Sequence, residues 1–372
     1  MGKLKLATIV GTRPELIKLS GVIKLAGSCF EHILIHTGQN YDYTLNEIFF
    51  EGLCLPAPDY FLEAPGDDLG ETIGNIIAKS YTLLKEIKPD AVLILGDTNS
   101  ALSAISAKRL KIPVFHMEAG NRCFDENLPE EVNRRIVDHI SDVNLAYTEH
   151  ARRYLLAENV RPEHVFVTGS PMPEVLKANA GKPTDILAQL ELEPNKYLLL
   201  SAHREENIDI EDNFQSLMDA INVLAEQYAL PIIYSLHPRS GKFIKQRGIE
   251  LDPLVKKKKP FGFNDYIALQ RSAFCVLSDS GTLAEESGIL RFPAVSLRTS
   301  TERPEAVDKG CFVIGGINAS TIRGAVELAV SLMDIKNPDV PDYGDLNVSA
   351  KVVKIIQGYT EIINERVWRK RI

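Results

Sequence analysis

Carboxylates gather directly after one apolar segment of the chain. Residues 116–131 read HMEAGNRCFDENLPEE, in which one arginine, Arg122, accompanies five acidic side chains. The acidic residues are Glu118, Asp125, Glu126, Glu130 and Glu131. Carboxylates are costly to bury without partners. The segment is therefore either a solvated loop or a place where side chains gain and lose protons during a reaction.

Two more titratable groups stand at the ends of apolar runs. Asp97 follows LILG in LILGDTNSALSA, and His203 ends LLLSAH. By residue type Asp97 is equally suited to cap a helix and to act in catalysis. A lone histidine is more often structural, but the ordinary pKa of histidine suits proton transfer. His237, in SLHPRS, is a weaker candidate of the same kind.

A candidate anion cradle lies near the N-terminus. The segment VGTRPELIKLS is typical of a strand, a glycine turn and a helix opened by Pro14. A helix N-terminus offers backbone N–H groups and a positive dipole end to an anion, and Arg13 and Lys18 lie in the same segment. Capping and solvation account for the two cations equally well. The segment is not GxGxxG and no P-loop occurs, which disfavours a dinucleotide or P-loop site.

A second segment of this kind lies in the other half of the chain. LSDSGTLAEESG predicts a strand, a Ser/Gly turn at Ser280 and Gly281, and a helix that begins with Glu285 and Glu286. It suits a second phosphate cradle, or a site where carboxylates bind sugar hydroxyls. A capping box explains the same residues without a ligand.

Cations also occur in this half. Arg298 and Arg303 precede another proline-opened helix in RTSTERPEA. The run KKKK at 256–259 reads as a solvated loop, with electrostatic steering of an anion as the alternative.

The elements that position these residues alternate between short apolar runs and longer amphipathic stretches, which is typical of βα units and parallel sheets. In the first half we expect strands at 5–11, 32–38, 91–97, 113–118, 143–149 and 165–169. Helices are expected between them at 14–26, 70–88, 99–110, 129–140 and 148–158. In the second half we expect strands at 197–203, 231–237, 273–279, 293–297 and 312–316.

The length of 372 residues favours two domains over one core. We expect an α/β fold of two Rossmann-like doubly wound domains that face a central cleft, because ligands bind at the carboxyl ends of such strands. The domains are residues 1–170 and 171–345, joined by the Pro- and Gly-rich segments VTGSPMPEVL and GKPTDILAQLELEPN. Residues 346–372 form a C-terminal helix that packs back on the N-terminal domain.

Composition excludes several classes of protein. A net charge of −8 argues against a nucleic-acid or anionic-membrane surface. No apolar run is long enough to span a membrane, and MGKLKLATIVGT lacks a signal-peptide core. Five scattered cysteines without CxxC spacing favour a reducing cytoplasm and disfavour a structural metal. The residues thus predict a two-domain enzyme that acts by acid–base chemistry on a phosphorylated or nucleotide-linked small molecule, without cofactor or metal.

Several short motifs, in their order along the chain, resemble the non-hydrolysing UDP-N-acetylglucosamine 2-epimerase family. They are GTRPE (11–15), GDT (96–98), HMEAGNR (116–122) with PEE (129–131), AHREEN (202–207), SDSG (278–281) with EE (285–286), and TERPE (301–305). The resemblance spans about residues 5 to 310. It implies a GT-B-like pair of Rossmann-like domains, a UDP-linked 2-acetamido sugar as substrate, and a homodimer.

Within that family three segments differ from the common pattern. They are GQNYDY (38–43), GNRCFDENLPEE and SGTLAEES, and they resemble the branch of UDP-N-acetyl-L-fucosamine synthases. The branch implies conversion of UDP-2-acetamido-2,6-dideoxy-L-talose to UDP-N-acetyl-L-fucosamine in capsule or O-antigen assembly. The alternatives are conversion of UDP-N-acetylglucosamine to UDP-N-acetylmannosamine, a hydrolysing epimerase, a GT-B glycosyltransferase and a non-catalytic UDP-sugar binder.

The resemblance implies a chemistry and a role for each matched residue. UDP leaves by anti-elimination across C1–C2, a 2-acetamidoglycal forms, and UDP adds back, which requires an acid, a base and a hold on the diphosphate. The resemblance implies that the acid–base carboxylates are Asp97, Glu118 and Glu130, with His203 acting on the diphosphate. It implies that the residues binding UDP are Arg13, Lys18, Ser280, Gly281, Glu286 and Arg303. Asp125, Glu126 and Glu131 are expected to be loop and helix-start charges.

Overall fold

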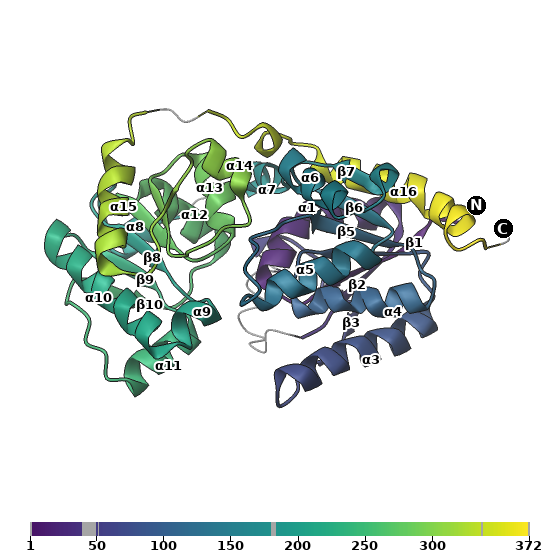
Figure 1. The fold of residues 1–372 in the computed structure, drawn as a ribbon, viewed down its shortest axis with the longest axis horizontal. Helices are drawn as coiled ribbons and strands as arrows, with labels where there is room; N and C mark the ends of the chain where they lie inside the picture. Colours follow the sequence, from purple (N-terminus) through teal and green to yellow (C-terminus); the bar gives the residue numbers. More distant parts are fainter. Residues whose placement is uncertain (1, 39–49, 51, 180–183, 336–337, 371–372) are drawn as a thin grey trace. The chain divides into compact units, whose positions relative to one another are not determined.

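The computed structural model describes residues 2–38, 50, 52–179, 184–335 and 338–370 (Figure 1). The GQNYDY segment beyond Gly38 and residues 181–183 of the expected linker lie outside these ranges. The chain forms two compact units, Met1–Asn179 with Asp342–Ile372, and Ala180–Pro341.

The first unit is built on a parallel seven-stranded sheet with the order β3-β2-β1-β4-β5-β6-β7. The strands are β1 (Lys5–Val10), β2 (Glu31–His36), β3 (Tyr60–Phe61), β4 (Ala91–Leu95), β5 (Val114–Ala119), β6 (Val143–Ala146) and β7 (Val165–Val167). The order reverses between β1 and β4, which is where ligands bind in open α/β sheets. The loops that follow β1 and β4 are therefore the first place to look for a site.

Helices cover both faces of this sheet because its strands are apolar on both sides. All five residues of β4, AVLIL, are buried. The helices are α1 (Arg13–Cys29), α3 (Leu69–Ile87), η1 (Asn99–Leu102), α4 (Ser103–Arg109), α5 (Pro129–Ile140), α6 (Glu149–Ala157), η2 (Pro162–His164), α7 (Met172–Asn179) and α16 (Val348–Arg366). One core lies between the sheet and α1 with α16, and another lies against α3 and α4.

The C-terminal helix α16 belongs to this first unit (Figure 1). Val352 and Ile356 are fully buried in the same core as Leu16 and Leu19 of α1. Burial of each such aliphatic side chain contributes about 1.5–3 kcal/mol. The last helix thus completes the core that the first helix begins.

The first unit extends past residue 170 because α7 is part of it. Met172 and Val175 are buried, and Glu174 accepts a hydrogen bond from the backbone N–H of Ser349 at 2.9 Å. The segment VTGSPMPEVL, interpreted from sequence as linker, therefore contains the start of a packed helix.

The second unit holds a parallel six-stranded sheet with the order β10-β9-β8-β11-β12-β13. The strands are β8 (Leu198–Ser201), β9 (Ile232–Ser235), β10 (Val255–Lys258), β11 (Cys275–Ser278), β12 (Ala294–Ser296) and β13 (Val313–Ile314). The helices are α8 (Ile186–Gln189), α9 (Glu205–Ile208), α10 (Glu211–Tyr228), α11 (Pro238–Gln246), α12 (Phe263–Ser272), α13 (Thr282–Leu290), α14 (Pro304–Asp308) and α15 (Ala319–Ser331). The short helix η3 (Pro341–Tyr343) spans the boundary at which the chain returns to the first unit. Two parallel α/β sheets were predicted, and this is confirmed.

The prediction of a loop at KKKK (256–259) is wrong. Lys256, Lys257 and Lys258 belong to β10, which pairs with β9 at the edge of the sheet. Their side chains are exposed while Val255 is buried. Lysines on an edge strand discourage pairing with another chain, so the run protects the sheet edge.

In the described part of the chain, every helix is too short or too polar to cross a membrane.

Candidate active site

The turn after β1 is closed by the carboxylate of Glu15. Its Oε2 accepts hydrogen bonds from the backbone N–H groups of Gly11 (2.9 Å) and Thr12 (2.7 Å) and from the Thr12 hydroxyl (2.8 Å). Its Oε1 accepts from the Thr98 hydroxyl at 3.0 Å, which ties the loop after β4 to α1. Two of the N–H groups expected to meet an anion are therefore occupied by the chain's own carboxylate.

Burial gives Glu15 unusual electrostatics. The side chain is 1% exposed. Desolvation raises its pKa to about 7, against the opposing effect of its hydrogen bonds. The turn itself requires glycine at position 11, since a Cβ there would lie 1.9 Å from the Ser100 hydroxyl.

Glu118, at the end of β5, is bound by Lys18 of α1. The Lys18 ammonium lies 2.8 Å from Oε1 and 2.7 Å from Oε2, and both side chains are nearly buried. Lys18, expected at the phosphates, thus holds a carboxylate. Glu118 has a φ of 63°, and the register of β5 with β6 shifts between Met117 and Ala119. Such strain in a non-glycine residue is characteristic of functional sites.

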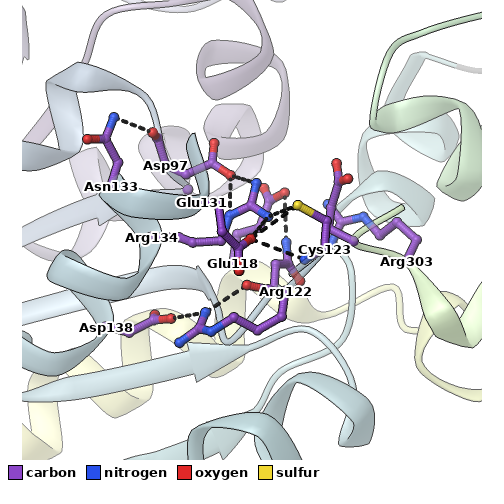
Figure 2. Close-up of polar contacts among 12 residues, drawn as sticks. Asp97, Glu118, Arg122, Cys123, Glu131, Asn133, Arg134, Asp138 and Arg303 are labelled. Carbon is purple, nitrogen blue, oxygen red and sulfur yellow. Dashed lines mark hydrogen bonds and ion pairs between the residues drawn. The ribbon is translucent and has the colours of Figure 1, made fainter. Parts of the chain in front are cut away.

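Asp97, after β4, is held by two residues of α5 (Figure 2). Arg134 donates from Nε (3.0 Å) and Nη2 (2.5 Å) to Asp97 Oδ2. Asn133 donates to the Asp97 backbone carbonyl and to Asn99 Oδ1, both at 3.0 Å. Sequence reasoning missed Arg134 and Asn133. Asn133 and Arg134 lie three and four residues after Glu130 on a proline-opened helix, and this spacing could have placed them on the same helix face as Glu130.

The two glutamates that open α5 differ in environment. Glu130 is half-buried. Glu131, expected to be a solvated helix-start charge, is instead fully buried and accepts from Arg134 Nη1 (2.9 Å) and the Cys123 N–H (3.1 Å). Burial raises its pKa, but the hydrogen bonds from Cys123 and the charge of Arg134 outweigh burial and lower it. The buried partner of the arginine is therefore the second glutamate of PEE.

In the second unit His203 follows β8 and faces Asp279. His203 Nδ1 lies 3.3 Å from Asp279 Oδ1, with the histidine side chain 44% exposed and the aspartate buried. Asp279 Oδ2 also accepts from the backbone N–H groups of His203 (2.8 Å) and Arg204 (2.9 Å) and from Asn207 Nδ2 (3.2 Å). Sequence analysis did not single out Asp279, although it stands at a strand end inside SDSG.

The other candidates of this unit have internal partners. Arg303 Nη2 lies 3.1 Å from Glu285 Oε2, with both side chains buried. Glu286 Oε2 accepts from Gln270 Nε2 at 2.6 Å. Gly281 opens α13, where a Cβ would lie 2.4 Å from Glu302 Oε1, and the neighbouring Ser280 hydroxyl contacts that of Thr282 at 3.0 Å.

The candidates divide between the two units. The first unit holds Arg13, Lys18, Asp97, Glu118 and Glu130, among which Lys18 and Glu118 are in direct contact. The second unit holds His203, Ser280, Gly281, Glu286 and Arg303. Across the described ranges, His, Cys, Asp and Glu side chains form no group of three or more that could hold a metal ion. Paired carboxylates and cations at the ends of parallel strands suit proton transfer next to an anion.

Comparison with known proteins identifies a family for this chain. The family model described as UDP-N-acetylglucosamine 2-epimerase matches residues 24–357. The UDP-N-acetylglucosamine 2-epimerase of Methanocaldococcus jannaschii is 37% identical over 95% of this chain and 99% of that protein. The UDP-2,3-diacetamido-2,3-dideoxy-D-glucuronate 2-epimerase of Pseudomonas aeruginosa is 32% identical over 95% of this chain and 99% of its own length.

Solved structures agree with the sequence relatives. The structure of UDP-N-acetylglucosamine 2-epimerase from Rickettsia bellii has a TM-score of 0.91 and 46% identity, covering 99% of this chain and all of that one. The Methanocaldococcus jannaschii enzyme in complex with UDP-GlcNAc and UDP has a TM-score of 0.89 and 35% identity, covering 95% of this chain and 100% of that one. The GT-B-like pair of parallel-sheet domains is confirmed.

Proposed function

We propose that this chain, which belongs to the UDP-N-acetylglucosamine 2-epimerase family, inverts C2 of a UDP-linked 2-acetamido sugar by eliminating and re-adding UDP. It is an epimerase. The observation that carries the mechanism is the pair of carboxylates, Asp97 and Glu118, each bound to a cation from a helix, at the ends of β4 and β5.

The chemistry explains why such carboxylates are needed. The proton at C2 of an intact sugar is poorly acidic because C2 has no neighbouring carbonyl. Elimination of UDP across C1–C2 requires a base at C2 and stabilisation of the departing diphosphate. Addition of UDP to the resulting 2-acetamidoglycal then returns a proton to the opposite face.

We assign acid–base roles to the carboxylates of the first unit. Asp97 and Glu118 exchange protons with the sugar, and Glu130, half-buried at the start of α5, completes the set. Arg134 donates to the Asp97 carboxylate and Lys18 donates to the Glu118 carboxylate, so a cation from a helix holds each of these two groups in place.

We assign the diphosphate and nucleotide to the remaining candidates. His203 acts on the diphosphate, and Asp279 at Nδ1 leaves Nε2 available to it. Arg13 and Lys18 provide positive charge, with Lys18 shared between Glu118 and the phosphates. The residues assigned to UDP in the second unit are Ser280, Gly281, Glu286 and Arg303.

For the sugar we propose UDP-2-acetamido-2,6-dideoxy-L-talose, converted to UDP-N-acetyl-L-fucosamine. Its support is the sequence of the loop GNRCFDENLPEE and of SGTLAEES. UDP-N-acetylglucosamine is the alternative, supported by the names of the relatives. A relative 32% identical is named for a third sugar, so sugar choice varies at this level of similarity.

Proton NMR in D2O tests both levels of the proposal. Each of UDP-N-acetyl-L-fucosamine, UDP-N-acetylglucosamine and UDP-2,3-diacetamido-2,3-dideoxy-D-glucuronate is incubated with the protein in a separate tube. Loss of the C2 proton signal with a new anomeric signal supports epimerisation, and the tube in which it occurs identifies the sugar. Retention of the C2 proton in all three tubes would contradict the proposal.

We further propose a cytoplasmic homodimer. The five cysteines are free thiols, which fits a reducing compartment. Light scattering measures the assembly: a mass near twice 41.3 kDa is expected, and a mass of one chain excludes the dimer.

A further inference from the structure

A buried histidine lies behind the carboxylates proposed for catalysis. His116, on β5, is 0% exposed. Its Nε2 lies 2.8 Å from the backbone carbonyl of Gly96, and its Nδ1 lies 2.9 Å from Oδ1 of Asp138, which is also fully buried. The second contact is close but does not have the geometry of a straight hydrogen bond.

The two neighbours of the ring are both acceptors. A backbone carbonyl cannot donate a proton, so Nε2 must carry one. Asp138 is ionised. Burial raises its pKa, but the contact with His116 and the charge of Arg122 have the larger effect and lower it overall. Its other oxygen accepts from Arg122 Nη1 at 2.7 Å. A bare Nδ1 is electron-rich and would be repelled by a carboxylate oxygen only 2.9 Å away, so Nδ1 carries a proton as well.

The charges around the ring agree with this. Arg122 also binds Glu158 through Nε (2.8 Å) and Nη2 (2.6 Å). Two carboxylates, Asp138 and Glu158, thus share one guanidinium. A charged His116 brings this cluster of four side chains to neutrality, and buried charge is tolerated where it is balanced and hydrogen-bonded.

The ring connects the three segments that carry the proposed acid–base residues. Gly96 immediately precedes Asp97. His116 itself lies two residues before Glu118, and the Asp138 carboxylate also accepts from the N–H of Gly120, two residues after it, at 3.1 Å. Asp138 belongs to α5, the helix that bears Arg134. Figure 2 shows Asp138 and Arg122 beside this group.

We propose that His116 is a doubly protonated imidazolium that positions the ends of β4 and β5 and helix α5 for C2 epimerisation. It is a positioning residue, because it acts through Gly96 and Asp138 and touches no reacting atom. The positioning role of His116 in catalysis rests on the proposed function, while the inferred charge of its ring does not.

Nitrogen NMR on protein labelled with ¹⁵N-histidine tests the charge state. The chain has eight histidines, and the signal of His116 is identified by its absence from the variant His116→Gln. At pH 7.5 both ring nitrogens of His116 are expected to carry protons and to give imidazolium shifts. A ring with one bare nitrogen in the folded wild-type protein would overturn the proposal.

Kinetics test the positioning role. His116→Gln keeps a donor for the Gly96 carbonyl and removes the charge. Since a misplacement of about 1 Å costs on the order of 100-fold in rate, we expect kcat to fall about 10–100-fold. KM should change less than about threefold, since only alignment is lost. If KM for the UDP-sugar rose by as large a factor as kcat fell, or if kcat did not change, the positioning role would be overturned.

Two further variants complete the test. His139→Gln, at a neighbouring histidine whose side chain is 46% exposed, is the matched control and should keep wild-type kcat. Asp138→Asn keeps the shape and should lower kcat like His116→Gln, so it serves if that variant does not fold. If the wild-type protein epimerises no sugar, the proposed function fails, and the NMR result still decides the charge of His116.

Discussion

The two groups of candidate residues, one in each unit, are stabilised in different ways. In the first unit the carboxylates meet cations from other elements, Glu118 with Lys18 and Asp97 with Arg134. In the second unit the half-exposed His203 meets one buried aspartate, Asp279, which is otherwise satisfied by N–H groups. The charges are fixed and paired where proton transfer is proposed, and the ring is more accessible where the diphosphate is proposed to bind.

The largest expected effect comes from removing a carboxylate in the first unit. Glu118→Gln keeps the shape of the side chain but cannot exchange a proton. Because a general acid or base contributes on the order of 10²–10⁴ in rate, C2-proton exchange should fall by about that factor. The measurement is deuterium incorporation at C2, followed by NMR.

The matched control for this variant is Glu126→Gln in the same loop. Glu126 is 75% exposed and pairs with a half-exposed arginine, so exchange should stay at the wild-type level. Wild-type exchange in Glu118→Gln would remove Glu118 from the mechanism. The paired charge around Glu118 would then be no sign of proton transfer in the first unit.

The next effect comes from the cation that holds Asp97. Arg134→Lys loses the planar fork that binds Asp97 and Glu131 together. Turnover should fall about 100-fold through misalignment, and the free energy of unfolding in urea by about 1–3 kcal/mol because the buried Glu131 carboxylate loses hydrogen bonds. Arg135→Lys, at a side chain 38% exposed, should change neither quantity, and equal values for the two variants would show that the buried pairing is unimportant.

A smaller effect is expected in the second unit. Asp279→Asn removes the negative charge from the group whose Oδ2 accepts the N–H groups of His203 and Arg204 and the side chain of Asn207. A hydrogen bond to a neutral acceptor is weaker by about 1 kcal/mol than one to a charged acceptor, so turnover should fall about tenfold as the His203 turn loosens. Asp209→Asn, at an exposed aspartate, is the control, and a loss as large as that of Glu118→Gln would contradict the comparison.

The smallest effect concerns pH and Glu15. Its pKa is raised in the folded protein from 4.5 to about 7, so the folded state binds the proton more tightly than the unfolded state. Its contribution to stability is therefore present below about pH 4.5 and lost as pH rises through 7. Glu15→Gln cannot ionise and should gain about 1–3 kcal/mol relative to wild type between pH 4.5 and 8.

Urea unfolding of both proteins at several pH values measures this difference. Glu71→Gln, at another glutamate in a first helical turn, is the control for loss of a carboxylate at such a position. A constant difference for Glu15→Gln would show that Glu15 titrates normally.

Sequence predicted the fold and the positions of the strand-end residues because both depend on local patterns. Buried strands such as AVLIL are apolar on both faces and can be recognised from sequence. The carboxyl ends of parallel strands lie at one edge of a sheet, and Asp97 and Glu118 could be predicted as site residues because they stand at such ends. The Lys256–Lys258 strand was missed because its place at the sheet edge is a tertiary property. The partners Arg134 and Asp279 were missed for the same reason, since pairing depends on how a helix or loop approaches a strand end.

The return of α16 to the first unit has a consequence for synthesis of the chain. Domains usually fold in order as they leave the ribosome, but the core around Leu16 and Leu19 lacks Val352 and Ile356 until the last residues are made. The second unit, contained within Ala180–Pro341, can fold while the first still exposes apolar surface. A nascent chain released before Val348 would therefore keep that surface uncovered, and the cell's chaperones and proteases would meet it first.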